Sequence, residues 1–144
     1  MKAKDFLNQY YNAKRKTSLL DRELNLLKET EGDIRATDYG KVIVDGTKNA
    51  DVIGDLVARI GDLEVRLLRA VEERTALMVD VLSVINRVED AVVQEVLMLR
   101  YVECLPWESI ADTLHYTTRH VHRLRLEGYE EVEKILKEDK WKTN

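Results

Sequence analysis

Two long runs of apolar residues recur at alternating spacings of three and four, and this heptad repeat constrains the fold most strongly. The shorter run consists of Phe6, Tyr10, Ala13, Thr17, Leu20, Leu24 and Leu27. The longer run is apolar at every position except Arg74 and consists of Ile53, Leu56, Ile60, Leu63, Leu67, Ala70, Arg74, Leu77, Val81, Val84 and Val88. A heptad repeat places such positions on one face of an α-helix. The pattern therefore predicts two long helices that bury these faces.

The residues between the two runs favour a connection that lets the helices pack against each other. Gly32 follows the first run, and glycine commonly stands just after the last residue of a helix. Turn-forming residues are frequent from 32 to 50, so this segment is predicted to be an irregular connector. Asn49 or Asp51 can cap the start of the second helix. We expect a long antiparallel helical hairpin over residues 1–88.

Further apolar residues flank both heptad faces and widen them beyond a two-helix contact. They are Leu7, Tyr11, Leu19, Leu26, Leu68, Val71, Met78, Leu82 and Ile85. Burying them requires a third or fourth helix, which a second copy of the chain supplies most simply. We therefore expect residues 1–88 to form the interface of a homodimer. Gly54 and Gly61 lie one heptad apart, either as surface glycines or where another backbone approaches closely.

The pattern changes in the C-terminal domain, which we place at residues 89–144. Pro106 is suited to the first turn of a helix, because the N–H that proline lacks has no intrahelical partner there. A short helix is predicted from Trp107 to Leu114, followed by a tight joint. Thr117 can cap a further helix that runs from about Thr118 to about Lys137. This order is typical of a helix-turn-helix and predicts an all-α protein.

Three segments of this domain resemble the fourth conserved region of bacterial sigma factors, which reads the upstream promoter element. They are Val96-Leu97-Met98-Leu99-Arg100-Tyr101, Trp107-Glu108-Ser109-Ile110-Ala111 and Leu114-His115-Tyr116-Thr117-Thr118-Arg119-His120-Val121. With a helical hairpin before such a domain, the whole chain resembles the ArpU/RinA-like late-gene activators of phages. The sequence departs from the sigma pattern at His115, where a small Gly is usual, and at Gly128, where an Ala is common. The resemblance implies DNA binding but not the sigma promoter sequence.

The candidate DNA-binding residues lie at the start of the predicted last helix. They are Thr117, Thr118, Arg119, His120, His122, Arg123 and Arg125. A helical wheel places Arg119, His122 and Arg123 opposite the apolar positions, where they face outward. We expect Arg119 to read guanine through its planar guanidinium, with His122 also contacting bases, while Arg123 and Arg125 hold phosphates.

Composition and motifs argue against other classes of protein. The formal net charge of −4 excludes a uniformly basic nucleic-acid binder, although Thr117 to Leu126 holds three Arg, two His and no acid. The single Cys104 excludes an internal disulfide and fits a reducing cytoplasm. No catalytic motif, phosphate-binding loop or convergent set of metal ligands is present, so we expect neither an enzyme, nor a cofactor, nor a metal. No apolar run is long enough to span a membrane.

The leading hypothesis is therefore a sequence-specific transcription regulator, phage-encoded and acting in the cytoplasm of a bacterial host. Its partners would be double-stranded DNA, a second copy of the chain and host RNA polymerase, contacted through the acidic hairpin or the acidic C-terminal helix. Two alternatives stay open. One is a DNA-packaging protein similar to a small terminase subunit, and the other is a helical adaptor that binds a protein instead of DNA.

Overall fold

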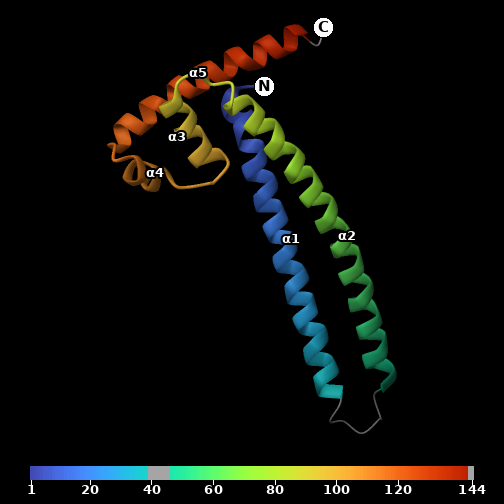
Figure 1. The fold of residues 1–144 in the computed structure, drawn as a ribbon. Helices are drawn as coiled ribbons and strands as arrows, with labels where there is room; N and C mark the ends of the chain where they lie inside the picture. Colours follow the sequence, from blue (N-terminus) through green and yellow to red (C-terminus); the bar gives the residue numbers. More distant parts are fainter. Residues whose placement is uncertain (39–45, 143–144) are drawn as a thin grey trace. The chain divides into compact units, whose positions relative to one another are not determined.

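In the computed structural model, which describes residues 1–38 and 46–142, the chain folds into helices and forms no strand within those two ranges (Figure 1). The helices are α1 (Ala3–Asp38), α2 (Gly46–Ile85), α3 (Ala91–Tyr101), α4 (Trp107–Leu114) and α5 (Thr118–Lys142). The predicted all-α class is confirmed. No helix in the described ranges has both the length and the apolar character needed to cross a membrane.

The chain divides into two compact units, and the division does not follow the domain boundary expected at residue 88. One unit consists of Lys14–Glu73, the other of Met1–Ala13 together with Arg74–Asn144. The second unit thus combines the first turns of α1 and the last turns of α2 with α3, α4 and α5. The physical reason is a shared hydrophobic core, described below.

The unit of Lys14–Glu73 is held by the predicted heptad faces. Leu24 of α1 forms a buried cluster with Ile60 and Leu63 of α2, and Leu20, Leu27 and Leu67 pack around that cluster. Thr17, also a heptad position, is buried. By contrast, the flanking residues Leu19, Leu26 and Leu68 are each about 60% exposed. The heptad positions are thus buried or half-buried, whereas the flanking residues Leu19, Leu26 and Leu68 face water.

The other unit has a core to which all five helices contribute. Leu7 of α1, Ile85 of α2, Leu97 of α3, Ile110 of α4 and Val121 of α5 are each fully buried within it. Leu7 and Ile85 belong to the apolar residues that flank the heptad faces. Their burial shows that helices of the same chain cover some of the flanking apolar residues, which we expected a second copy of the chain to cover.

The first helix continues beyond its predicted end. α1 passes through Gly32 to Asp38, so the expectation of an irregular connector over residues 32–50 is wrong where α1 and α2 extend into it. An ion pair of i,i+4 spacing joins Arg35 Nε to Glu31 Oε1 at 2.9 Å and supports the extra turns. Gly32 costs about 1 kcal/mol in a helix interior, which neighbouring helix formers can offset. Residues 39–45 of the predicted connector lie outside the described ranges.

The second helix starts earlier than predicted. It begins at Gly46, so the proposed capping residues Asn49 and Asp51 lie inside it. Farther along α2, a Cβ atom added at Gly54 or at Gly61 would meet no atom within 4 Å. Within the described part of the chain, both are therefore surface glycines, and no close backbone approach explains them.

Polar contacts fix the entry into α3 and the course of α5. Asp90 caps α3, its Oδ1 accepting from the N–H groups of Val92 at 2.9 Å and Val93 at 3.2 Å. Arg87, in the loop before Asp90, donates from Nη1 to both carboxylate oxygens of Asp139 at 2.7 and 2.9 Å. Residues of the loop before α3 thus make polar contacts with both α3 and α5, and these contacts help to position the two helices.

Candidate nucleic-acid interface

A three-residue joint from His115 to Thr117 connects α4 to α5. His115 adopts the left-handed conformation, with φ 58° and ψ 39°. The N–H of Tyr116 donates to the carbonyl of Ala111 at 2.9 Å, which closes the end of α4. Histidine enters this region more readily than most residues with a side chain. His115 thus takes a left-handed conformation, which glycine adopts most readily.

Thr117 caps α5, as predicted. Its Oγ1 accepts from the N–H of His120 at 3.2 Å, and its carbonyl accepts from the N–H of Val121 at 3.1 Å. The N–H groups of the first residues of a helix have no intrahelical acceptor, and the positive end of the helix dipole lies there. Since the first turn of α5 contains no acid, this helix start is suited to an anion such as a phosphate.

Buried apolar side chains hold α4 against α5. Ile110 and Ala111 of α4 share the hydrophobic core with Val121 and Leu124 of α5. Ile110 and Val121 are fully buried. This packing sets the position of α5 relative to α4 and leaves the other side of α5 exposed.

The exposed side of α5 carries two arginines. Thr117, Thr118, Arg119 and Arg123 are all exposed, which confirms the predicted outward position of both arginines. His120 is half-buried beside them: Arg123 donates from Nη2 to His120 Nδ1 at 2.8 Å. Because a guanidinium has no acceptor, Nδ1 must be the acceptor, which leaves Nε2 of His120 to carry the proton.

His122 is less exposed than Arg119, so its predicted outward position holds only in part. The imidazole is half-buried with its centroid 5.4 Å from that of the Trp107 ring in α4. Its Nδ1 is buried and has no hydrogen-bond partner among the described residues. A helical wheel of α5 alone could not show this, because the position of α4 decides which sides of α5 are covered.

Arg125 also packs against Trp107. Its guanidinium carbon lies 5.3 Å from the Trp107 ring centroid and 5.7 Å from that of Tyr129. Arg100 at the end of α3, absent from the candidate residues, approaches the same indole at 4.8 Å. Arg100 and Trp107 lie in segments of the sigma-like resemblance, but spacing alone does not show that they meet.

Tyr101 supports this aromatic cluster from the core. Its hydroxyl is hydrogen-bonded to that of Tyr129, and its ring meets Trp107 edge-on with centroids 6.4 Å apart. Burial, followed by the hydrogen bond with Tyr129, raises the pKa of Tyr101 well above its ordinary value. Tyr101 is therefore a neutral structural group that fixes the indole at the start of α4.

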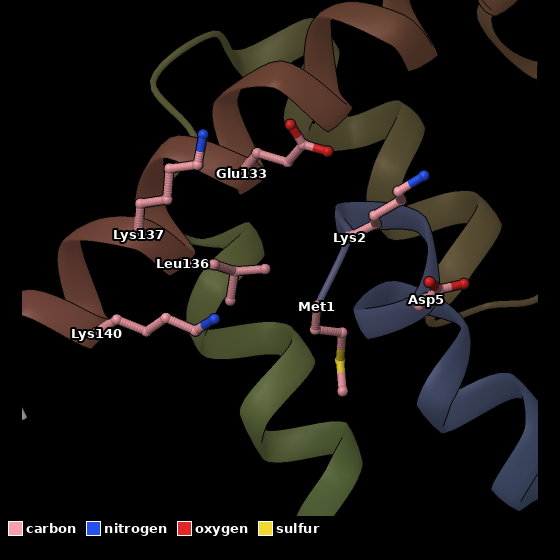
Figure 2. Close-up of a pocket in the computed structure, with 7 residues that line it drawn as sticks. All are labelled: Met1, Lys2, Asp5, Glu133, Leu136, Lys137 and Lys140. Atoms are coloured by element: carbon pink, nitrogen blue, oxygen red, sulfur yellow. The ribbon is translucent and has the colours of Figure 1, made fainter.

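A separate pocket of about 630 Å³ lies in the same unit (Figure 2). Figure 2 shows that its side chains come from the start of α1 and from the C-terminal half of α5. Lys2, Lys137 and Lys140 line it together with Asp5 and Glu133, so its charges largely balance. Among the residues that the structure describes, no group of three or more His, Cys, Asp or Glu is placed to hold a metal ion.

The start of α5 therefore presents two exposed guanidinium groups beside N–H groups that lack intrahelical acceptors, on a helix whose position is fixed by α4. Such a surface can hold phosphates and donate paired hydrogen bonds to guanine. No protein-family model, curated protein or solved structure matches this chain.

Proposed function

We propose that the chain is a sequence-specific DNA-binding transcription regulator in which α4 and α5 form a helix-turn-helix. In this proposal α5 is the recognition helix and enters the major groove. The observation that carries the proposal is the pair of exposed arginines, Arg119 and Arg123, within the first two turns of a helix that Thr117 caps and α4 positions. Arginine is the side chain best suited to pair with guanine O6 and N7.

Local charge supports DNA as the partner despite the acidic chain. The net charge is −4, yet the ten residues from Thr117 to Leu126 contain no acid. Carboxylates follow immediately, at Glu127, Glu130, Glu131 and Glu133. Within α5, the stretch without acidic residues therefore lies at the start of the helix, which favours a small footprint with few phosphate contacts.

The remaining parts of the proposal concern the whole chain. An antiparallel hairpin of α1 and α2 precedes the helix-turn-helix and joins two copies, so that two recognition helices meet two half-sites. The protein is phage-encoded, acts in the cytoplasm of a bacterial host and contacts host RNA polymerase. The acidic residues in the second half of α5 or the acidic hairpin provide that contact. The resemblance to sigma region 4 and to ArpU/RinA-like activators supports this context.

Selection of binding sites from random double-stranded DNA tests the proposal. We expect an enriched motif, and a complex with the enriched duplex that withstands heparin competition in an electrophoretic mobility assay. Failure to enrich any motif, with no heparin-resistant complex, would contradict DNA binding and favour a protein-binding adaptor. Specific binding by a ring of many subunits would instead assign the chain to DNA packaging.

A further inference from the structure

The indole of Trp107 brings two cationic side chains together at the start of α4. The guanidinium carbons of Arg100 and Arg125 lie 4.8 and 5.3 Å from its ring centroid, so they are no more than about 10 Å apart. Both arginines and Trp107 are half-buried. The ring is held edge-on by the buried Tyr101. The two positive charges are therefore fixed in place near each other.

Neither positive charge is neutralised by the described part of the chain. No described carboxylate lies within ion-pair distance of Arg100 or Arg125. Arg100 donates from Nη1 to the carbonyl of Leu105 at 3.0 Å, whereas Arg125 Nε is buried without a hydrogen-bond partner. Two like charges held together without an acid favour an anion, and a guanidinium suits phosphate because its donors match the phosphate oxygens.

The position of Arg125 on the proposed recognition helix indicates that this anion is a phosphate of the DNA backbone. Arg125 follows Arg119 by six residues, which places it about 120° around α5 and about 9 Å farther along it. When Arg119 faces the bases, Arg125 therefore points to the side of the helix. A helix in the major groove, about 12 Å wide, has a sugar-phosphate strand on each side. The first helix of a helix-turn-helix crosses such a strand, and Trp107 begins α4.

We propose that Arg100 and Arg125 bind neighbouring backbone phosphates of double-stranded DNA, with Trp107 as the positioning residue that holds both guanidinium groups. This inference rests on the proposed function and adds Arg100 and Trp107 to the interface. The two arginines provide affinity that does not depend on sequence, in contrast to Arg119. Each phosphate contact contributes about −0.9 to the slope of log K against log salt concentration.

The test compares Arg100→Gln with Lys134→Gln in the full chain. Lys134 is an exposed residue of α5, so its replacement removes one positive charge outside the proposed interface. Binding to the selected duplex and to random duplex is titrated between about 50 and 200 mM salt. We expect Arg100→Gln to make the slope about 0.9 less steep for both duplexes and to leave their affinity ratio unchanged. Lys134→Gln should retain the wild-type slope.

If circular dichroism shows that Arg100→Gln does not fold, Trp107→Leu and Arg125→Gln keep the proposal testable. Trp107→Leu retains both positive charges but removes the ring that orients them, so the slope should again become less steep. A wild-type slope in folded Arg100→Gln and in folded Trp107→Leu would overturn this inference while specific binding stands. If the wild-type chain binds no duplex, the proposed function fails as well.

Inorganic phosphate, added at constant ionic strength, separates a DNA backbone site from a site for a free anion. We expect millimolar phosphate to leave the tryptophan fluorescence of the free protein unchanged, because one phosphate lacks the neighbouring groups of a strand. A fluorescence change that saturates with phosphate and disappears in Arg100→Gln would assign the site to a small anion and overturn the proposal.

Discussion

Two neighbouring residues on the first turns of α5 act as a pair. Arg123 donates to Nδ1 of His120 at 2.8 Å, and the ring of Tyr116 meets that imidazole edge-on with centroids 4.7 Å apart. The hydrogen bond restricts the rotamers of Arg123, which lowers the entropy lost when it binds a phosphate. We therefore propose that His120 contributes to DNA binding through Arg123.

This coupling predicts the outcome of a double-mutant cycle. His120→Ala should weaken DNA binding by about 0.5–1.5 kcal/mol, the net worth of one hydrogen bond. In the Arg123→Ala background the same change should cost almost nothing, because the group that His120 orients is gone. Dissociation constants of the four proteins for the selected duplex measure this. Additive losses would show that His120 acts independently of Arg123.

Tyr101 makes stability depend on pH in the alkaline range. Burial raises the pKa of its phenol in the folded protein, so the folded state holds this proton more tightly than the unfolded state. The stabilisation is fully present below the ordinary pKa of about 10 and is lost as the pH rises through the folded-state pKa. The free energy of unfolding should therefore fall between about pH 10 and 11, by at most about 1.4 kcal/mol per unit from this group.

Tyr101→Phe removes the ionisable group and keeps the ring. Its free energy of unfolding, from urea titrations at several pH values, should fall less steeply than that of the wild type above about pH 10. At neutral pH the variant should lose about 1 kcal/mol with the hydrogen bond to Tyr129. Equal alkaline slopes in the two proteins would show that Tyr101 does not hold its proton more tightly when folded.

At the scale of the helices, two glycines should respond oppositely to the same substitution. A Cβ at Gly128 of α5 would lie 3.0 Å from both methyl carbons of Leu97, which is fully buried among core side chains. Gly128→Ala should therefore destabilise by about 1 kcal/mol, because overpacking outweighs the gain in helix propensity. At Gly61 of α2 the added carbon meets nothing within 4 Å. Gly61→Ala should stabilise by up to about 1 kcal/mol.

Thermal or urea unfolding of both variants provides the measurement, and each serves as the control for the other. Stabilisation by Gly128→Ala would mean that Leu97 yields, and that the packing of α3 against α5 is looser than described.

The sequence predicted the presence of the helices better than their ends. Heptad spacing identified the faces around Leu24 and Leu63 because burial follows directly from periodicity. Gly32 was misleading, since glycine can end a helix or lie within one, and the surrounding residues decide. Asp90 was missed as a cap, although Asp is a favoured capping residue, because the short helix α3 has no long apolar repeat that marks where it starts.

The candidate site was predictable where the chemistry is local. Thr117 caps the helix that it immediately precedes, and the exposure of Arg119 follows from the apolar face around Val121. The position of His122 and the meeting of Arg100 with Trp107 depend on how α3 and α4 pack on α5. Such contacts between distant residues leave no periodic signal in a single sequence.

For the molecule as a whole, we propose that assembly depends on the unit of Lys14–Glu73. Among the described residues of this unit, the exposed large apolar side chains are Leu19, Leu26, Val52, Val57, Val65 and Leu68. In the other unit, helices of the same chain bury some of the apolar residues that flank the heptad faces, such as Leu7 and Ile85. The homodimer that we propose therefore forms through the exposed apolar residues, and the buried Leu63 belongs to the fold of each copy.

The substitutions Leu26→Glu and Leu68→Glu test this assembly together. The double variant should be a monomer of 16.7 kDa by light scattering, whereas the wild type should have twice that mass. The control is the double variant Asn25→Glu and Ala58→Glu, which changes two exposed residues. It adds the same two charges without removing a large apolar side chain, and it should remain a dimer. A wild type that is monomeric at micromolar concentration would contradict the dimer.

The central claim is that the exposed start of α5 reads DNA sequence, and the ratio of specific to random affinity tests it most directly. Arg119→Ala should lower the affinity for the selected duplex by about 1–3 kcal/mol, or roughly 5- to 150-fold, with a much smaller loss on random duplex. The control is His122→Gln, because His122 packs against Trp107. This variant should keep the wild-type ratio of specific to random affinity. An unchanged ratio in folded Arg119→Ala would contradict the assignment of α5 as the recognition helix.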